Sequence, residues 1–465
     1  MADYDVVVIG AGPGGYVCAI RAAQLGNNVA IVDKQWLGGV CLNVGCIPSK
    51  ALLDSAHTVH KVRERADEYG LSFDGLDIDY SAAVKRSRQA ADRLTNGVGF
   101  LMKKHDIDVH MGTATFTGPK TIQVEPEDGE TQEFNAENIV IATGAQAAMI
   151  PGVEADGERV LTYYEAILQE SLPKSVVVVG AGPIGLEFAT IWNSYGVEVS
   201  IIEMMDRLAP LEDPEVSKEV AKAFRGKGIE LYLGHKVEDI EVLKTKVKVN
   251  VSGEEGDQTV DGEQALIAIG WTPNTGELGL DAAGVNVDDN GYVQIDGRMA
   301  TNVEGVWAIG DVTGKLPLAH VASAMGIVCA ENISGVETVE LDYKMMPRAT
   351  FSDPQIASFG LTEAEAEEEG YEVKIGRFPF QANGKALGMG EKRGWVKLIT
   401  DAKYGEILGA HMVGPEVTEL LPELTISQMM ELTPAEIARN VHAHPTLSET
   451  LMEAAHMAEG HAIHI

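Results

Sequence analysis

The stretch Asp5-Val-Val-Val-Ile-Gly10-Ala-Gly12-Pro13-Gly-Gly15 decides how this chain begins to fold. Its β-branched run, bounded by glycine, is typical of a buried parallel strand, and residues 16–25 then have the pattern of a helix ending at Gly26. In such a turn Gly10 permits a tight bend, Gly12 lets backbone approach a pyrophosphate, and Gly15 brings helix against strand. The helix N-terminus attracts the phosphates. The stretch therefore predicts a dinucleotide-binding unit.

The same pattern recurs 170 residues later, as Ser175-Val-Val-Val-Val-Gly180-Ala-Gly182-Pro183-Ile-Gly185. A lone glycine motif is weak evidence, but a repeat with its strand and helix predicts two dinucleotide-binding units. Each unit continues to a second strand that ends in a carboxylate, Asp33 in the first and Glu203 in the second. Such a carboxylate binds the 2′-hydroxyl of an adenosine ribose and repels a 2′-phosphate. Only one basic residue, Arg207, follows closely after Glu203, so the second unit is expected to prefer NAD over NADP.

Further strand-like runs outline the domains. Residues 139–143 and 265–270 each close a nucleotide unit, and residues 306–311 indicate a return to the first one. From about residue 347 the pattern changes to alternating strands followed by amphipathic helices. We therefore predict an α/β protein with two Rossmann-like domains and a C-terminal α+β domain. The expected boundaries are 1–150, 151–275, 276–345 as the return segment, and 346–465.

Composition narrows the class of protein. Acidic residues outnumber basic ones 70 to 36, and the formal charge of -34 argues against nucleic-acid binding and against anionic membranes. The excess fits a strongly hydrated surface, adaptation to high salt, or a docking face for a basic partner, and the sequence leaves all three open. No apolar run reaches about 18 residues, so membrane insertion is not expected. The chain enters a strand directly after Met1, without a targeting pattern, which favours a cytoplasmic location.

Cys41 and Cys46 lie in Gly38-Gly-Val-Cys41-Leu-Asn-Val-Gly45-Cys46-Ile-Pro48-Ser-Lys50. Five residues along an ideal helix separate Cα atoms by about 8–9 Å, more than the roughly 7 Å that a disulfide tolerates. The backbone must therefore bend between the cysteines, and Gly45 offers the place. If Pro48 lies in the first turn of a helix, Cys46 sits at its positive end, where a thiolate is stabilised.

These features predict a reducible redox dithiol. The alternatives are two unrelated buried thiols or a metal site, and no nearby pair of Cys or His residues supplies the other ligands of a tetrahedral ion, so no metal is expected. The other cysteines, Cys18 and Cys329, lie in apolar, helix-like stretches and are expected to be buried.

With these residues in view, the chain resembles the dihydrolipoyl dehydrogenase family of flavin-dependent disulfide oxidoreductases over essentially its whole length. Besides the dithiol, the matching stretches are Ala142-Thr-Gly144, Gly180 to Glu187, Ala268-Ile-Gly270 with Pro273-Asn274, Gly310-Asp311, Asp353-Pro354 with Gly360-Leu-Thr-Glu363, and Ala443-His444-Pro445-Thr446-Leu-Ser-Glu449. The resemblance implies FAD in the first unit, NAD⁺ in the second, and a C-terminal dimerisation domain.

The resemblance also implies roles for single residues. Cys41 matches the thiol that exchanges with substrate, Cys46 the thiol that contacts the flavin, and His444 with Glu449 the base and the carboxylate that orients it. Positions that meet FAD in the family are Gly10, Gly12, Gly15, Asp33, Lys50, Ala114, Thr143, Gly144, Asp311 and Ala319. Positions that meet NAD are Gly180, Gly182, Gly185, Glu187, Glu203, Val237 and Gly270.

In the family, the histidine acts on the dithiol of the opposite subunit, which implies a homodimer. The implied partner is a lipoyl domain or a lipoyl-bearing acyltransferase core, from a 2-oxoacid dehydrogenase or glycine cleavage system. The alternatives are enzymes that resemble glutathione, trypanothione or mercuric reductase, and a docking subunit without activity. The departures are Asp33, Pro183, Trp271 in place of arginine, and Ser323-Ala324-Met325 in place of an acidic stretch.

Overall fold

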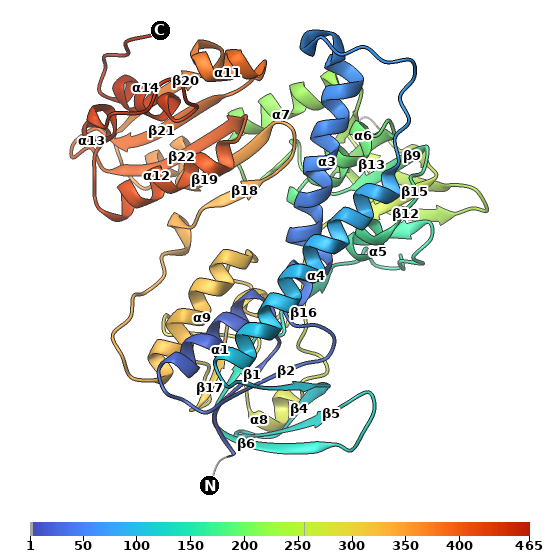
Figure 1. Cartoon of the computed structure of the whole chain (residues 1–465), viewed down its shortest axis with the longest axis vertical. Helices are drawn as coiled ribbons and strands as arrows, with labels where there is room; N and C mark the ends of the chain where they lie inside the picture. The colour runs from blue at the N-terminus through green and yellow to red at the C-terminus, as the bar shows by residue number, and fades with distance from the viewer. Residues whose placement is uncertain (1–2, 255) are drawn as a thin grey trace.

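The computed structural model describes residues 3–254 and 256–465, which form several packed α/β bodies (Figure 1). The first body is built on a parallel sheet in the order β3-β2-β1-β6, with β17 joining β6 on its far side. The strands are β1 (Tyr4–Ile9), β2 (Val29–Asp33), β3 (Asp108–Met111), β6 (Gln132–Ile141) and β17 (Val306–Ala308). Residues 306–308 therefore pair with the first sheet.

The beginning of β6 also belongs to an antiparallel ribbon with β4 (Thr113–Gly118) and β5 (Thr121–Glu125). One face of the parallel sheet carries α1 (Pro13–Gln24) against α9 (Ala319–Ile333). These two helices approach closely, because a Cβ added at Gly326 would lie 2.5 Å from the carbonyl oxygen of Gly14. Their contact fixes the N-terminus of α1, where the first glycine turn lies.

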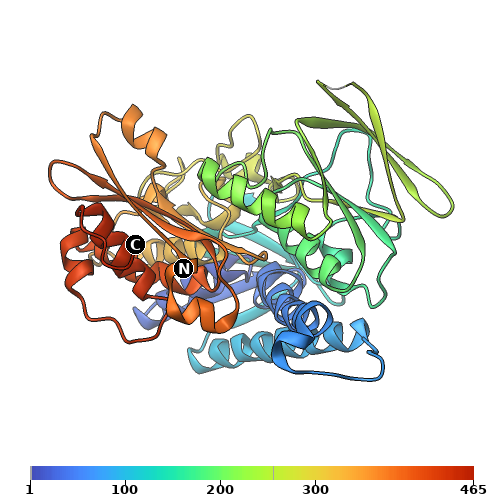
Figure 2. The ribbon, with the colours of Figure 1, turned by 90° about the horizontal axis from the view of Figure 1, so that it is seen from above.

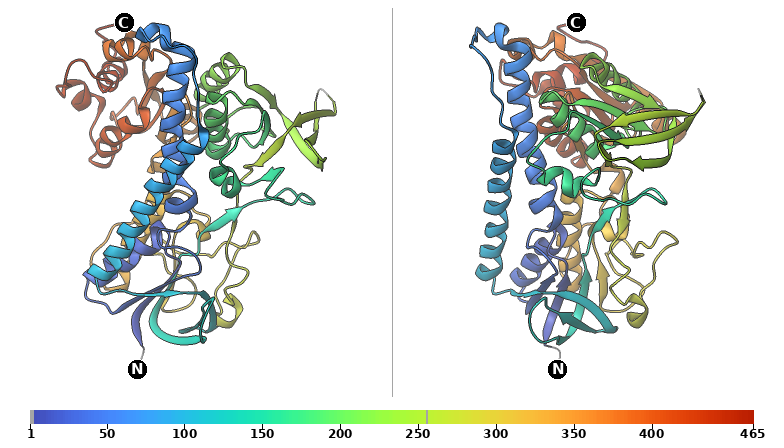
Figure 3. Two further views of the ribbon diagram at one scale, coloured as in Figure 1. Left: turned by 45° about the vertical axis from the view of Figure 1, so that its right-hand side comes forward. Right: turned by 90° about the vertical axis from the view of Figure 1, so that its right-hand side faces the viewer.

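The dithiol segment lies on α2 (Gly39–Val44) and the first turn of α3 (Cys46–Arg65), and α4 (Tyr80–Lys104) packs against α3. Figure 3 shows α3 and α4 as long neighbouring rods that run from the first body up to the second. Their apolar sides are buried, and Leu52 and Leu53 of α3 pack in one core with Trp192 of the second body. This shared core sets the first nucleotide unit against the second.

The second body repeats the parallel sheet in the order β11-β10-β9-β15-β8. Its strands are β8 (Val160–Leu161), β9 (Ser175–Val179), β10 (Glu198–Glu203), β11 (Glu230–Leu233) and β15 (Gln264–Ile267), and its helices are α5 (Tyr163–Leu168), α6 (Pro183–Ser194) and α7 (Pro214–Gly226). An antiparallel meander is formed by β12 (His235–Val242), β13 (Val247–Gly253) and β14 (Gln258–Gly262). A ribbon of β7 (Ala145–Ala147) and β16 (Trp271–Pro273) lies between the bodies, before α8 (Leu280–Ala283).

The C-terminal body is an antiparallel sheet in the order β18-β19-β22-β21-β20, flanked by helices, and Figure 2 shows it at the opposite side of the molecule from the second body. The strands are β18 (Arg348–Thr350), β19 (Gln355–Gly360), β20 (Val373–Pro379), β21 (Trp395–Asp401) and β22 (Ile407–Gly414). The helices are α10 (Glu363–Glu368), α11 (Gly384–Met389), α12 (Val417–Met429), α13 (Pro434–Arg439) and α14 (Glu449–Ala458). The predicted fold class, two Rossmann-like units plus an α+β body, is confirmed.

Element boundaries differ slightly from the expectation. The first helix begins at Pro13 rather than Tyr16, because Gly12 caps it in an extended conformation and proline suits the first turn. The strands predicted for residues 139–143 and 265–270 end at Ile141 and Ile267. Just beyond each end, the carbonyl of Ala142 or Ala268 lies against the glycine turn and no longer pairs in the sheet. Within residues 3–254 and 256–465, no helix combines the length and apolarity needed to cross a membrane.

Candidate active site at the dithiol and the two nucleotide turns

The dithiol segment bends where its spacing requires. Helix α2 ends at Val44, Gly45 leaves helical geometry with φ -134° and ψ -116°, and α3 begins at Cys46. A Cβ at Gly45 would lie 2.9 Å from the carbonyl oxygen of Val40 and 3.1 Å from the Cα of Cys41, so glycine is needed for the close return of the chain. In this structure Cys41 and Cys46 are free, half-buried thiols.

The two thiols are not equivalent. Their mutual hydrogen bond, together with burial, raises the pKa of Cys41 far above its usual range. The same hydrogen bond lowers the pKa of Cys46, against the opposing effect of burial and with help from the nearby positive charge of Lys50. Cys46 is also the first residue of a 20-residue helix, where the helix dipole favours a thiolate. Of the two thiols, Cys46 is therefore the more readily ionised, and Cys41 holds its proton more tightly.

A charged pair joins the dithiol helix to the second nucleotide unit. Lys50, one turn after Cys46, places its Nζ 2.8 and 2.9 Å from the carboxylate oxygens of Glu187 on α6. The backbone N–H of Phe351 donates to the same carboxylate at 3.0 Å, and the Lys50 ammonium lies 4.6 Å from the centre of the Phe351 ring. The Glu187 side chain is only 7% exposed, so this partly desolvated pair holds both side chains in place.

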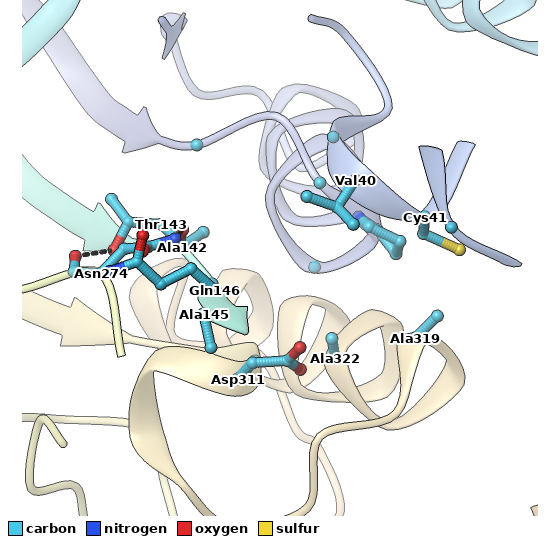
Figure 4. Close-up of a pocket in the computed structure, with 18 of the residues that line it drawn as sticks. Val40, Cys41, Ala142, Thr143, Ala145, Gln146, Asn274, Asp311, Ala319 and Ala322 are labelled. Carbon is cyan, nitrogen blue, oxygen red and sulfur yellow. Dashed lines mark hydrogen bonds between the residues drawn. The ribbon is translucent and has the colours of Figure 1, made fainter. Parts of the chain in front are cut away.

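A cavity of about 660 Å³ opens beside these residues and joins the two nucleotide units. Its walls include both cysteines, and Figure 4 shows Cys41 on one side and Asp311 and Ala319 on the other. Thr143 and Asn274 close one wall by exchanging two hydrogen bonds of 2.9 Å, from the Thr143 hydroxyl to the Asn274 carbonyl and from the Asn274 amide to the Thr143 carbonyl. Of the positions predicted from sequence, the cavity is lined by Gly10, Gly12, Asp33, Cys41, Cys46, Lys50, Ala114, Thr143, Gly144, Glu187, Asp311 and Ala319.

The two glycine turns have the same geometry. Gly10 and Gly180 have φ values of 104° and 103°, and a Cβ there would lie 2.2 and 2.3 Å from the carbonyl oxygen that follows the neighbouring strand. Gly15 and Gly185 are equally constrained, because each would place a Cβ within 2.0 Å of the carbonyl oxygen of the first glycine of its turn. These four positions admit no side chain.

The carboxylates at the ends of β2 and β10 brace the turns. Asp33 accepts the N–H of Ala11 at 2.7 Å, and Glu203 accepts the N–H of Ala181 at 2.8 Å. Two carboxylate oxygens offer about four acceptor sites, so each retains capacity for a ribose hydroxyl. The structure thus brings Gly180, Gly182, Gly185 and Glu203 together at the second turn, outside the large cavity.

The residues of the first turn fit a flavin dinucleotide. A Cβ at Gly12 would meet nothing within 4 Å, which leaves open space directly before the uncapped N-terminus of α1 for a pyrophosphate. At the other end of the cavity, burial raises the pKa of Asp311 to about 6. Its carboxylate points into the cavity, where a ribityl hydroxyl can donate to it. The space for a pyrophosphate at Gly12, the ribose acceptor Asp33 and the buried carboxylate of Asp311 thus lie along one cavity.

His444 lies elsewhere in the chain. Its Nδ1 is 2.9 Å from Oε1 of Glu449, whose other oxygen accepts the Thr446 N–H at 2.8 Å. Burial acts to raise the pKa of Glu449, but the hydrogen bonds from Thr446 and His444 outweigh it and keep the carboxylate charged. The imidazole is 78% exposed, with Nε2 turned away from the carboxylate, and it does not line the cavity of its own chain as far as the described residues go. A histidine so oriented can act as a base on a group brought to it from outside the chain.

Several site residues carry no signal in the local sequence. Trp36 and Tyr163 line the cavity, and Tyr163 packs 5.5 Å from Trp271, the position where the family pattern has arginine. Phe351 was missed as well, because nothing in its local sequence marks it as a partner of Glu187. Two further predicted NAD positions also lie outside the cavity lining: Val237 is 9% exposed within the core under the β12–β14 meander, and Gly270 joins β15 to β16. Among the described residues, no group of three or more His, Cys, Asp or Glu side chains could hold a metal ion.

Comparison with known proteins places this site in a family. Residues 4–326 match the family model described as pyridine nucleotide-disulphide oxidoreductase, and residues 346–455 match the dimerisation domain of the same family. The chain is 50% identical over 464 residues to a dihydrolipoyl dehydrogenase of Mycobacterium tuberculosis, with all of both chains covered. It is 43% identical to that of Bacillus subtilis, with 99% of each chain covered.

Solved structures agree with the sequence relatives. The crystal structure of LpdA from Mycobacterium tuberculosis superposes with a TM-score of 0.91 at 27% identity, covering 97% of this chain and 99% of that one. The Cu(II) complex of the HOCl-induced flavoprotein disulfide reductase RclA from Escherichia coli gives a TM-score of 0.88 at 27% identity, covering 98% and 100%. The chain therefore belongs to the pyridine nucleotide-disulphide oxidoreductase family and, within it, to the dihydrolipoyl dehydrogenases.

Proposed function

We propose that this protein oxidises protein-bound dihydrolipoamide to lipoamide and delivers the two electrons to NAD⁺. The observation that carries the proposal is the unequal dithiol: Cys46 begins helix α3 one turn before Lys50 and has a lowered pKa, while the pKa of Cys41 is raised. Lys50 in turn is bound to Glu187 of the second nucleotide unit, so the cavity that holds the dithiol extends to helix α6 of that unit. Full-length relatives that are dihydrolipoyl dehydrogenases support the same activity.

The chemistry at the cysteines follows from their positions. Nε2 of His444 accepts a proton from one thiol of dihydrolipoamide, and the resulting thiolate attacks the sulfur of Cys41 in the Cys41–Cys46 disulfide. Cys46 leaves as a thiolate, stabilised by the helix N-terminus and Lys50. The second substrate thiol then displaces Cys41, closing the lipoamide disulfide and leaving two electrons and one proton on the cysteine pair. Bound FAD supplies the two-electron carrier between this dithiol and NAD⁺.

Nucleotide binding is assigned to the two turns. We propose that Gly10, Gly12, Gly15, Asp33, Lys50, Ala114, Thr143, Gly144, Asp311 and Ala319 contact FAD, and that Gly180, Gly182, Gly185, Glu187, Glu203, Val237 and Gly270 contact NAD. On this assignment residues 1–150 with 276–345 form the FAD domain, 151–275 the NAD domain and 346–465 the dimerisation domain. The carboxylate of Glu203 repels a 2′-phosphate, so kcat/KM with NAD⁺ should exceed that with NADP⁺.

Quaternary structure follows from the place of His444. Since it lies away from the dithiol of its own chain, we propose a homodimer in which each subunit lends His444 and Glu449 to the Cys41–Cys46 pair of the other. The dimerisation domain at residues 346–455 supports this arrangement. The proposed partner is a lipoyl domain or lipoyl-bearing acyltransferase of a 2-oxoacid dehydrogenase or glycine cleavage system, met in the cytoplasm. The formal charge of -34 supports a further proposal, that activity rises between low and molar KCl.

A substrate panel tests the function. The FAD-loaded dimer is assayed with lipoyl domains carrying dihydrolipoamide, with free dihydrolipoamide and with glutathione disulfide, against both nicotinamides. We expect NAD⁺ reduction by the lipoyl substrates and a loss of this activity in His444→Gln, while NADH oxidation by ferricyanide is retained. Faster turnover of glutathione disulfide than of any lipoyl substrate would overturn the assignment, as would full activity of His444→Gln.

A further inference from the structure

A second cavity of about 650 Å³ lies where three parts of the molecule meet. It is bounded by the C-terminal half of α3, the end of α7 and the loops between strands of the C-terminal sheet. Figure 1 shows α3, α7 and the C-terminal body as neighbours on the side of the molecule away from the first sheet. The cavity shares no lining residue with the dithiol cavity, and none of the residues assigned to the reaction contributes to it.

The charge of this cavity is opposite to that of the whole chain. Six Lys and Arg residues line it against four carboxylates, in a protein with a formal charge of -34. The cations are Lys61, Arg65, Lys222, Lys227, Lys392 and Arg393, and the carboxylates are Glu219, Asp353, Glu391 and Glu416. His57 and His60, one turn apart on α3, add two ring systems that can donate hydrogen bonds.

Part of this charge is structural. Lys227 pairs with Asp353 at 2.5 Å, Arg65 pairs with Glu391 at 2.5 Å, and Arg393 lies 3.5 Å from Glu219. The ends of α3 and α7 add about half a negative charge each. The three carboxylates and the two helix ends therefore balance the positive charges of Lys227, Arg65 and Arg393.

The other three cations of the cavity form no such ion pair. In the part of the chain that the structure describes, Lys61, Lys222 and Lys392 have no carboxylate within 4.0 Å. They come from α3, α7 and the loop before β21, three segments far apart in sequence. Their convergence on one concave site is the arrangement that binds a compact polyanion, because several ammonium groups can reach one cluster of oxygens.

We propose that this cavity binds a phosphorylated small molecule that carries at least two phosphate groups. The volume lies within the usual 300–1,000 Å³ range of ligand sites and exceeds what one inorganic phosphate fills. Lys61, Lys222 and Lys392 contact the phosphate oxygens. His60 supplies a neutral donor, since burial and then the charge of Lys227 lower the pKa of its imidazole. Trp395 and Pro354 give the cavity an apolar wall for the rest of the ligand.

Tripolyphosphate serves as the probe, because it lacks the adenosine that would direct a nucleotide to the NAD turn. Its binding to the FAD-loaded dimer is measured by isothermal titration calorimetry in about 0.1 M KCl, where the Debye length is about 10 Å. We expect one site per subunit. The test variant replaces all three unpaired lysines by alanine and should weaken binding at least about tenfold, since hydrogen bonds to charged groups contribute strongly.

The control removes the same charge outside the cavity, with Lys218→Ala, Lys374→Ala and Lys385→Ala combined. Lys218 lies one turn before Lys222 on α7, and Lys385 lies on α11 near the cavity, but neither lines it. The control should change the dissociation constant less than about twofold. Flavin absorbance and dihydrolipoamide oxidation report that both variants are folded.

Three results would overturn the proposal. One is equal weakening in test and control variants, which would mean that net charge alone attracts the probe. Another is the absence of any saturable binding to the parent protein. The third is tighter binding of citrate than of tripolyphosphate at matched ionic strength, which would assign the cavity to carboxylate ligands instead.

Discussion

Replacing Glu449 by glutamine separates the orientation of His444 from the rest of the catalytic apparatus. The carboxylate holds Nδ1 of His444 at 2.9 Å and the N–H of Thr446 at 2.8 Å. Glutamine has nearly the same shape and keeps one acceptor oxygen. It removes the negative charge that stabilises the imidazolium formed when His444 takes a proton.

The size of the effect follows from the geometry. A hydrogen bond between charged groups contributes about 1.5–3 kcal/mol, which corresponds to a factor of about 10–150 in rate. Because the His444 side chain is 78% exposed in one chain and Glu449 is 20% exposed, water screens part of this interaction. We therefore expect kcat/KM for dihydrolipoamide to fall about tenfold in Glu449→Gln.

Helix α14 offers a matched control one turn away. Glu453 holds Nδ1 of His464 at 2.7 Å in the same manner, and no step of the reaction uses it. Glu453→Gln should leave kcat/KM within about twofold of the parent value. Oxidation of NADH by ferricyanide, which needs no base at the dithiol, should be unchanged in both variants.

Either of two results would contradict the orienting role of Glu449. If Glu449→Gln and Glu453→Gln lose equal activity, the effect comes from helix stability and not from orientation of a base. If the ferricyanide reaction falls in parallel with dihydrolipoamide oxidation, the substitution has damaged the nucleotide sites. Thermal unfolding of both variants, followed by circular dichroism, distinguishes these cases.

Four further substitutions probe the cavity. Lys50→Met removes a positive charge that helps lower the pKa of Cys46. In the two-electron-reduced enzyme, the pH midpoint of the long-wavelength absorbance should therefore move upward. An unchanged midpoint would contradict the electrostatic role of Lys50. Folding raises the pKa of Asp311 from 3.8 to about 6, so the folded protein binds this proton more tightly than the unfolded chain does. The free energy of unfolding of the flavin-free protein should therefore fall, by at most about 3 kcal/mol, as the pH rises from about 4 to 6. Urea unfolding of Asp311→Asn should show no such loss. Gly10→Ala places a Cβ 2.2 Å from a backbone oxygen and should prevent folding. The Cβ of Gly12→Ala meets no atom within 4 Å, so this variant should fold, but its methyl group occupies the space for the pyrophosphate and should weaken FAD binding. The flavin retained after gel filtration measures this binding.

Local features of the chain follow from short stretches of its sequence. The strands around Gly10 and Gly180, the helices after Pro13 and Pro183, and the bend at Gly45 depend on residues within a few positions of one another. Local conformational rules therefore predict them. The dithiol, the NAD preference and the fold class follow from such short patterns, and the repeat at 170 residues makes two nucleotide units the expected arrangement.

Contacts between distant segments do not follow from short stretches. The sequence assigns Lys50 to FAD and Glu187 to NAD, but only the packing of α3 against α6 joins them, across 137 residues, and adds Phe351 as the third partner. Local patterns carry no information on which distant side chains meet, since that depends on how helices and sheets pack.

The sequence by itself determined the dithiol, its bend and the two nucleotide turns, because backbone geometry at glycine and proline is a local property. Tertiary structure added the hydrogen bond from Cys41, which, together with the charge of Lys50, lowers the pKa of Cys46 against the opposing effect of burial. It also decided that His444 stands apart from the cysteines of its own chain, and that three lysines converge on a second cavity. Charge and proximity depend on the folded distances between residues that the chain order keeps far apart.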